Sequence, residues 1–211
     1  MKTTDKRSPR AAALLLAVSL FLPLLSPPGL AAAEPARPPR FFVGVLAGYF
    51  YPGQGTFRKI YDQPAWPIEL QLGWSLNRKI SVFGAVRYLA TTGNTVLLDA
   101  RQAEESYVLR WRQATLRLGV NYWPWPSRFA PFLGAGLSYS FYREQWQDAP
   151  LRTEGGKTGF FVQAGGRYRL GRRWHALAQL EYSFIPAGSG ARGTVNLGGI
   201  NLSLGLTVGI F

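Results

Sequence analysis

The stretch IELQLGWSL, residues 68–76, carries the clearest structural signal in the chain. Its residues alternate strictly between apolar and polar or small: Ile68, Leu70, Leu72, Trp74 and Leu76 against Glu69, Gln71, Gly73 and Ser75. An α-helix, with 3.6 residues per turn, would mix the two sets on every face. A β-strand places them on opposite faces, so the period of two predicts a strand with one apolar side.

The same period recurs along the chain and predicts an all-β protein. The first strand is apolar or glycine on both faces, and the fourth changes phase near Arg112, which indicates a bulge or an extension beyond a membrane. We therefore expect an eight-stranded antiparallel up-and-down transmembrane β-barrel over 41–211. Its strands are predicted at 41–51, 66–76, 80–90, 107–123, 129–142, 158–170, 174–185 and 197–211.

The connections between these strands alternate in length. Three are short turns, at 77–79, 124–128 and 171–173. Four are long and rich in glycine, proline and charge, and they are predicted to be extracellular loops: 52–65, 91–106, 143–157 and 186–196. Short turns on one side and long loops on the other are typical of outer-membrane barrels with both termini in the periplasm.

The N-terminal segment has the order of a secretory signal. Basic residues from Lys2 to Arg10 precede an apolar run over 11–25, and Ala31-Ala32-Ala33 offers a cleavage site. The alternative is a membrane anchor, but the run is shorter than the ~20 residues that a spanning helix needs. We expect 1–33 to be a cleaved signal peptide and 34–40 a proline-rich lead-in.

The type of barrel depends on which strand face is inside. A soluble barrel of lipocalin type would bury its apolar face and expose the polar one. An exposed polar face usually carries lysine, yet Lys59, Lys79 and Lys157 are the only lysines after residue 33, and all lie in predicted loops or turns. The polar positions hold glycine, serine and glutamine instead, which favours a narrow lumen with the apolar face toward lipid.

A few charges also fall on the predicted inner face. Buried charges require partners, so we expect a charge network in the lumen. If the first short turn is centred on Arg78, Glu69 lies opposite Arg87 across the hairpin. A turn centred on Arg172 sets Gln163 opposite Glu181 and Arg169 opposite His175. The predicted network comprises Glu69, Arg87, Arg117, Arg167, Arg169 and Glu181.

Aromatic residues share the apolar face and lie mostly near strand ends. Ordinary core packing would favour the middle of the strands, whereas a membrane barrel needs aromatic girdles at both interfaces. The predicted interface aromatics are Tyr49, Tyr51, Trp74, Tyr88, Tyr122, Tyr139, Tyr168, Trp174 and Tyr182.

The chain is basic, with 24 Lys+Arg against 11 Asp+Glu. Such a balance would usually suggest nucleic acid, but no exposed basic stripe with interleaved aromatics is present, so no nucleic-acid partner is expected. The predicted short turns carry Arg78, Lys79, Arg128, Arg172 and Arg173 without an acidic residue. These turns suit anionic phospholipid headgroups.

Together the eight alternating strands, the runs PFLGAGLSY (131–139) and VQAGGRY (162–168), and the terminal Phe211 resemble small outer-membrane barrels of the OmpA/OmpX/OmpW type. The resemblance covers 41–211. It implies phospholipid and lipopolysaccharide as partners, periplasmic chaperones and the barrel-assembly machinery in biogenesis, and Phe211 as the assembly signal. Here the chain departs from the family, because counting back in twos from Phe211 meets Gly209, Thr207 and Gly205 rather than apolar residues.

Catalytic signatures are weak. His175 is the single histidine, and no serine stands where a lipid deacylase would need it. Glu69 and Glu181 could imitate a carboxylate dyad, but structural ion pairing explains them better. Without cysteine or a histidine cluster, no metal site, disulfide or cofactor is expected.

We therefore expect a non-enzymatic protein of the Gram-negative outer membrane with a structural or adhesive role through its four long loops. Two alternatives stay open. One is passive uptake of small, possibly apolar molecules, and the other is a soluble periplasmic carrier of lipocalin type.

Overall fold

The computed structural model describes residues 39–61, 63–99, 102–125, 127–147, 152–190 and 193–210. The predicted signal peptide, most of the lead-in and Phe211 lie outside this part of the chain. Within it, no helix is long and apolar enough to cross a membrane.

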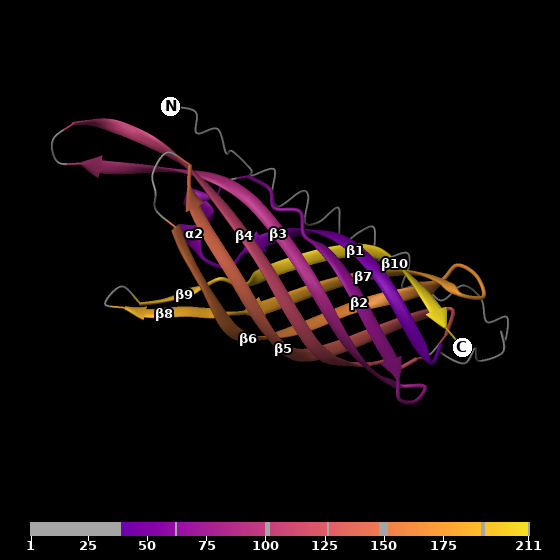
Figure 1. The fold of residues 1–211 in the computed structure, drawn as a ribbon. Coiled ribbons are helices and arrows are strands. Elements are labelled where there is room, and N and C mark those ends of the chain that lie inside the picture. Colours follow the sequence, from indigo (N-terminus) through magenta and orange to yellow (C-terminus); the bar gives the residue numbers. More distant parts are fainter. Residues whose placement is uncertain are drawn as a thin grey trace, which may run out of the picture. The chain divides into compact units, whose positions relative to one another are not determined.

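Eight antiparallel strands close into a barrel, in the order β1-β10-β7-β6-β5-β4-β3-β2 (Figure 1). The first and last strands of the barrel pair with each other, so the closed part of the sheet has no edge strand. The eight-stranded antiparallel barrel that the sequence predicted is confirmed. Its strands are β1 (Phe41–Pro52), β2 (Ile68–Ser75), β3 (Ile80–Asp99), β4 (Gln102–Tyr122), β5 (Phe129–Trp146), β6 (Arg152–Arg169), β7 (Trp174–Phe184) and β10 (Gly199–Ile210).

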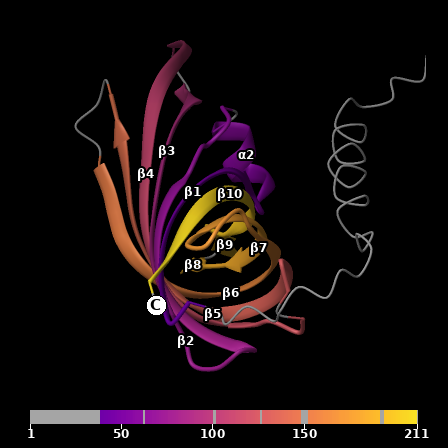
Figure 2. The same ribbon diagram turned by 90° about the vertical axis from the view of Figure 1, so that its right-hand side faces the viewer.

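The four segments predicted as long loops contain regular structure, so that prediction was wrong in detail. The first holds a short helix, α2 (Gly55–Ile60), and the last holds a separate hairpin of β8 (Pro186–Gly190) and β9 (Gly193–Asn196). The other two are continuations of the β3–β4 and β5–β6 hairpins, and the former extends past α2 (Figure 2). Alternation of apolar and polar residues could not reveal these extensions, because the backbone pairs there although the residues follow no period of two.

Strand register follows the predicted turns. Glu69 pairs with Arg87, Gln163 with Glu181 and Arg169 with His175, so all three predicted pairings are confirmed. In the β2–β3 turn, the Asn77 side-chain oxygen accepts hydrogen bonds from the backbone N–H groups of Lys79 and Ile80, both at 2.8 Å. This local turn fixes the register of the whole hairpin.

Over most of its length the barrel is inverted relative to a soluble protein. Large apolar side chains point outward, with Leu118 68% and Leu137 65% exposed. Polar side chains line the inside, where Ser140 and Asn201 are fully buried. This arrangement is opposite to the one expected of a lipocalin-like barrel.

Side chains fill the interior. Phe42, Phe83, Ala85 and Phe161 form one buried cluster within it. A β-carbon on Gly136 would lie 2.6 Å from Phe161 and 2.2 Å from the backbone oxygen of Leu118. Glycine at this position therefore makes room for a lumen aromatic, as expected for a barrel of eight strands, whose interior is about as wide as the side chains that fill it.

Candidate functional site

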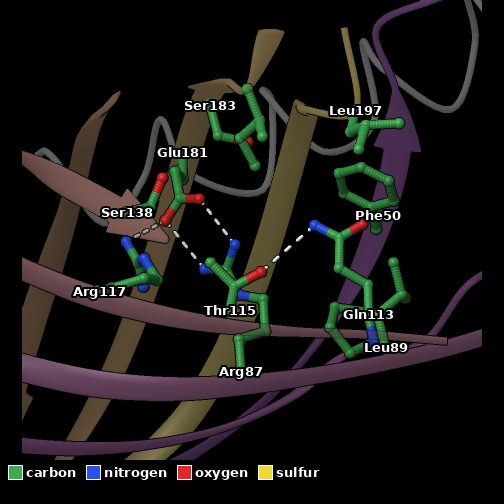
Figure 3. A pocket seen from close by; sticks show the side chains of 12 residues that line it. Phe50, Arg87, Leu89, Gln113, Thr115, Arg117, Ser138, Glu181, Ser183 and Leu197 are labelled. Carbon is green, nitrogen blue, oxygen red and sulfur yellow. Dashed lines mark hydrogen bonds and ion pairs between the residues drawn. The ribbon is translucent and has the colours of Figure 1, made fainter. Parts of the chain in front are cut away.

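Four charged side chains from four strands meet in the lumen. Figure 3 shows three of them, Arg87, Arg117 and Glu181. Arg87 on β3 donates from Nε to Glu69 Oε2 on β2 at 2.8 Å. Its two terminal nitrogens donate to the two carboxylate oxygens of Glu181 on β7, at 2.7 and 2.9 Å. Arg117 on β4 donates to Glu69 at 2.6 Å and also pairs with Glu181. We call these four residues the lumen network.

Charge balance makes the burial of the lumen network possible. Glu69, Arg87, Arg117 and Glu181 are at most 7% exposed. Two acids and two guanidiniums sum to zero, and each carboxylate contacts both arginines. Desolvating ions costs several kcal/mol each, and only good pairing with further hydrogen bonds offsets that cost. Neither carboxylate is left as a free base, so the arrangement is that of a structural ion cluster.

Neutral side chains also contact the lumen network, and the predicted network did not include them. Arg117 donates to Gln163 Oε1 at 2.8 Å, and the amide nitrogen of Gln163 donates to Asn121 at the same distance. The Arg117 guanidinium also lies 4.2 Å from the ring centroid of Phe161. The alternation of the sequence predicts that these side chains lie on the inner face. Which of them are in contact is determined only by closure of the barrel.

Two predicted members do not belong to the lumen network. Within the described residues, Arg167 and Arg169 make no ion pair with an acid. Gln163 is the residue opposite Glu181, so Arg167 lies four residues, or roughly 13 Å, further along its strand. Its guanidinium stacks instead on Trp123, 4.3 Å from the ring centroid. The prediction placed these arginines on the correct face but at the wrong height.

An apolar layer fills the lumen near the short turns. Trp123 lies in it and donates from its indole nitrogen to Ser81 Oγ at 2.9 Å. His175, at the start of β7, is also buried toward this end. The layer consists of Leu46, Trp123, Ala130, Phe132 and Leu177.

A second apolar layer closes the opposite mouth, and α2 forms part of it. Phe57 and Ile60 of the helix pack against a buried cluster of Tyr61, Leu109, Trp111, Ile185 and Leu197. The Tyr61 hydroxyl donates to Glu144 at 3.0 Å. Burial, reinforced by the Glu144 carboxylate, holds the pKa of Tyr61 above its ordinary range, so the phenol stays a proton donor. We call this arrangement the mouth cluster.

Strand β4 exchanges the polarity of its two faces at the mouth. Leu109 and Trp111 point inward into the mouth cluster, while Arg110 and Arg112 point outward and are exposed. The pairing of β4 with β5 runs without interruption from Leu109 to Tyr122, so no bulge is present there. The change of phase near Arg112 therefore marks an extension of the strand, one of the two predicted explanations.

All nine predicted interface aromatics point outward, each at least 36% exposed. They lie in two sets at the two ends of the outer apolar surface. Trp74, Tyr122, Tyr168 and Trp174 are close to the short turns, and Tyr49, Tyr51, Tyr88, Tyr139 and Tyr182 are toward the mouth cluster.

The described part of the lumen contains a small cavity beside the lumen network. A cavity of about 20 Å³ lies between the lumen network and the mouth cluster, and it is lined in part by Arg87, Glu181 and Leu197. That volume suffices for about one water molecule. Within the described residues, no group of three or more acidic, histidine or cysteine side chains is placed to hold a metal ion.

Known structures share this fold. No family model matches the chain, and no curated protein is found to resemble it. The outer membrane protein OprG from Pseudomonas aeruginosa is 15% identical, with a TM-score of 0.58 over 83% of this chain and 98% of its own. A major outer membrane protein from Thermus thermophilus is 13% identical, with a TM-score of 0.57 over 80% and 98%. Neisserial surface protein A is 16% identical, with a TM-score of 0.55 over 81% and 97%.

The protein thus has the fold of the small eight-stranded outer-membrane β-barrels, as its sequence resemblance to the OmpA/OmpX/OmpW type implied. Within that fold, the described residues form the lumen network and the mouth cluster.

Proposed function

We propose that this chain is an integral protein of the Gram-negative outer membrane with a structural or adhesive, non-catalytic role. The apolar outer surface supports membrane residence, because water-exposed leucines in such number would be costly. The structures of similar fold are outer-membrane proteins, which is in keeping with this location.

The closed lumen is the observation that carries the proposed role. The lumen network lies between two apolar layers. A water-filled passage would therefore require the mouth cluster, the lumen network and the apolar layer near the short turns each to rearrange. Purified protein in planar lipid bilayers should therefore give no steady single-channel conductance. A stable conducting state would contradict the scaffold role and favour passive uptake of small molecules.

The orientation of the barrel follows the same proposal. The β3–β4 and β5–β6 hairpins, α2 and the β8–β9 hairpin would face outward, and the short turns would face the periplasm. An epitope inserted between Asp99 and Gln102 should bind antibody on intact cells. The same epitope between Arg172 and Arg173 should bind only after the outer membrane is permeabilised. The reverse result would invert the proposed topology.

Membrane residence can be tested directly. The mature chain should require detergent or lipid to remain dispersed, and it should show a heat-dependent shift in gel mobility. A folded monomer that stays in buffer without detergent would instead support the lipocalin-like carrier.

The steps of biogenesis belong to the proposal as well. Residues 1–33 would be removed during export, and periplasmic chaperones would deliver the chain to the barrel-assembly machinery. Replacing Phe211 with serine should lower the yield of heat-modifiable barrel in cells without changing refolding in detergent. An unchanged yield in cells would remove Phe211 as the assembly signal.

A further inference from the structure

The outer surface of the barrel carries two arginines that face each other at the edge of the apolar surface. Arg112 on β4 and Arg143 on β5 are register partners, and both are exposed. Side chains directly opposite each other on neighbouring strands have β-carbons about 4.5–5.5 Å apart, and like charges in that position destabilise the sheet. A shared anion would remove this repulsion.

The surrounding charges do not supply such an anion in full. Glu154 pairs with Arg143 at 3.3 Å, but it also pairs with Arg152 at 2.6 Å. Arg112 forms no ion pair with any described residue. With Arg110 included, this outward patch holds four guanidiniums and one carboxylate among the side chains that the structure describes. The patch is therefore strongly cationic.

An apolar notch adjoins the two arginines on the side of the lipid-facing surface. Tyr88, Ala114 and Phe141 are side by side on three neighbouring strands, and the small alanine stands between the two rings. The resulting groove has a volume of about 460 Å³, and Arg112, Arg143 and Glu154 line it as well. A molecule held here would place an anionic group on the arginines and an apolar part on the aromatic rings.

We propose that this groove binds a phosphorylated glycolipid of the outer leaflet, with one phosphate monoester between Arg112 and Arg143 and an acyl chain on Ala114. Guanidinium groups bind phosphate in bidentate geometry, and a monoester carries more than one negative charge at neutral pH. The position of the pair matches the depth of a headgroup, because the outward face is apolar on one side of it and charged on the other. This inference rests on the proposed orientation of the barrel.

Lipid retention by the full mature protein in detergent tests the proposal, with diphosphoryl lipid A as the probe and native mass spectrometry as the readout. The double variant R112Q/R143Q should retain the lipid about tenfold more weakly, because two charge-assisted contacts are lost. The control R172Q/R173Q removes the same charge at the opposite end and should retain lipid like the unchanged protein. Equal retention by R112Q/R143Q and the control would overturn the proposal.

A second variant tests the apolar half of the groove. Ala114→Trp fills the notch, keeps every charge and points away from the lumen, so it should weaken lipid A retention by a similar factor. Inorganic phosphate and phosphatidylglycerol serve as separate arms. If either gives the same arginine-dependent binding as lipid A, the ligand is not a glycolipid monoester and the proposal is overturned.

Failure of this inference can be separated from failure of the proposed function. Each sample is first scored for its heat-dependent gel shift, which reports a folded membrane barrel. A shifted sample without arginine-dependent retention contradicts only the lipid site. A sample that needs no detergent contradicts the outer-membrane assignment itself, and with it the lipid site.

Discussion

Two regions of β4 place apolar and charged side chains on opposite faces. Midway along the outer apolar stretch of β4, which runs from Tyr122 toward Arg112, Leu118 faces outward and Arg117 faces the lumen network. Eight residues before, Arg110 faces outward and Leu109 lies in the mouth cluster. The pleat is unbroken between them. In the proposed membrane location, the medium outside the barrel changes along the strand, since lipid selects apolar side chains and the aqueous side selects charged ones.

Removing one member of the lumen network should have the largest effect. Arg87→Met leaves Glu181 and Glu69 with a single shared guanidinium, and a buried pair broken in this way costs about 3–5 kcal/mol. Urea unfolding in detergent micelles, followed by tryptophan fluorescence, measures the change. The double variant R87M/E181L should recover part of the loss, since it removes one charge of each sign. A double variant as unstable as the single would show that packing, not charge, dominates.

The second-largest effect should come from a charge on the outer face, and it should differ between the outer apolar surface and the β3 extension. Leu118→Arg places a cation against lipid and should cost about 2–4 kcal/mol, as for arginine at the middle of a bilayer. Asn94→Arg adds the same residue to the outward face of the β3 extension and should cost less than about 1 kcal/mol. Unfolding in phospholipid bilayers checks both. Equal costs would mean that the two regions face the same medium.

A smaller effect is expected at the mouth cluster. Tyr61→Phe removes the hydrogen bond to the Glu144 carboxylate and should cost about 1.5–3 kcal/mol. The loss should be local, so hydrogen exchange of the backbone amides at the end of α2 should rise more than exchange in the lumen-facing strands. Tyr49→Phe, on the outward face, is the matched control and should leave α2 unchanged.

The weakest effect should come from the exposed ion pairs. Glu154→Gln removes the contacts with Arg143 and Arg152, whose side chains are about half exposed, and should change stability by about 0–1 kcal/mol. Added salt should reduce even this difference, since exposed charges are screened. A larger, salt-independent loss would mean that Glu154 organises the hairpin.

Much of the barrel was predictable because a strand with one apolar and one polar face must alternate. The alternation in 68–76 predicted a strand and the face on which each of its residues lies. The turn centred on Arg78 then placed Glu69 opposite Arg87. Pairing across one hairpin depends only on counting from the turn. Arg167 and Arg169 were assigned to the lumen network on face alone, and face does not specify height in the lumen.

The hairpin extensions were missed for a related reason. Beyond the apolar surface, glycine, threonine and charged residues follow no period of two, so 91–106 and 143–157 looked like loops. Their backbone groups still pair, because the hydrogen-bonded ladder does not depend on which medium the side chains meet.

The sequence by itself determined the strand faces and the pairing within the two hairpins whose turns were located, because both depend on residues close in the chain. Only the closed tertiary structure decided which distant groups meet, such as Arg87 with Glu181 and Tyr61 with Glu144. The height of each side chain in the lumen depends on the registers of all eight strands together. A pattern within one segment of the chain cannot specify it.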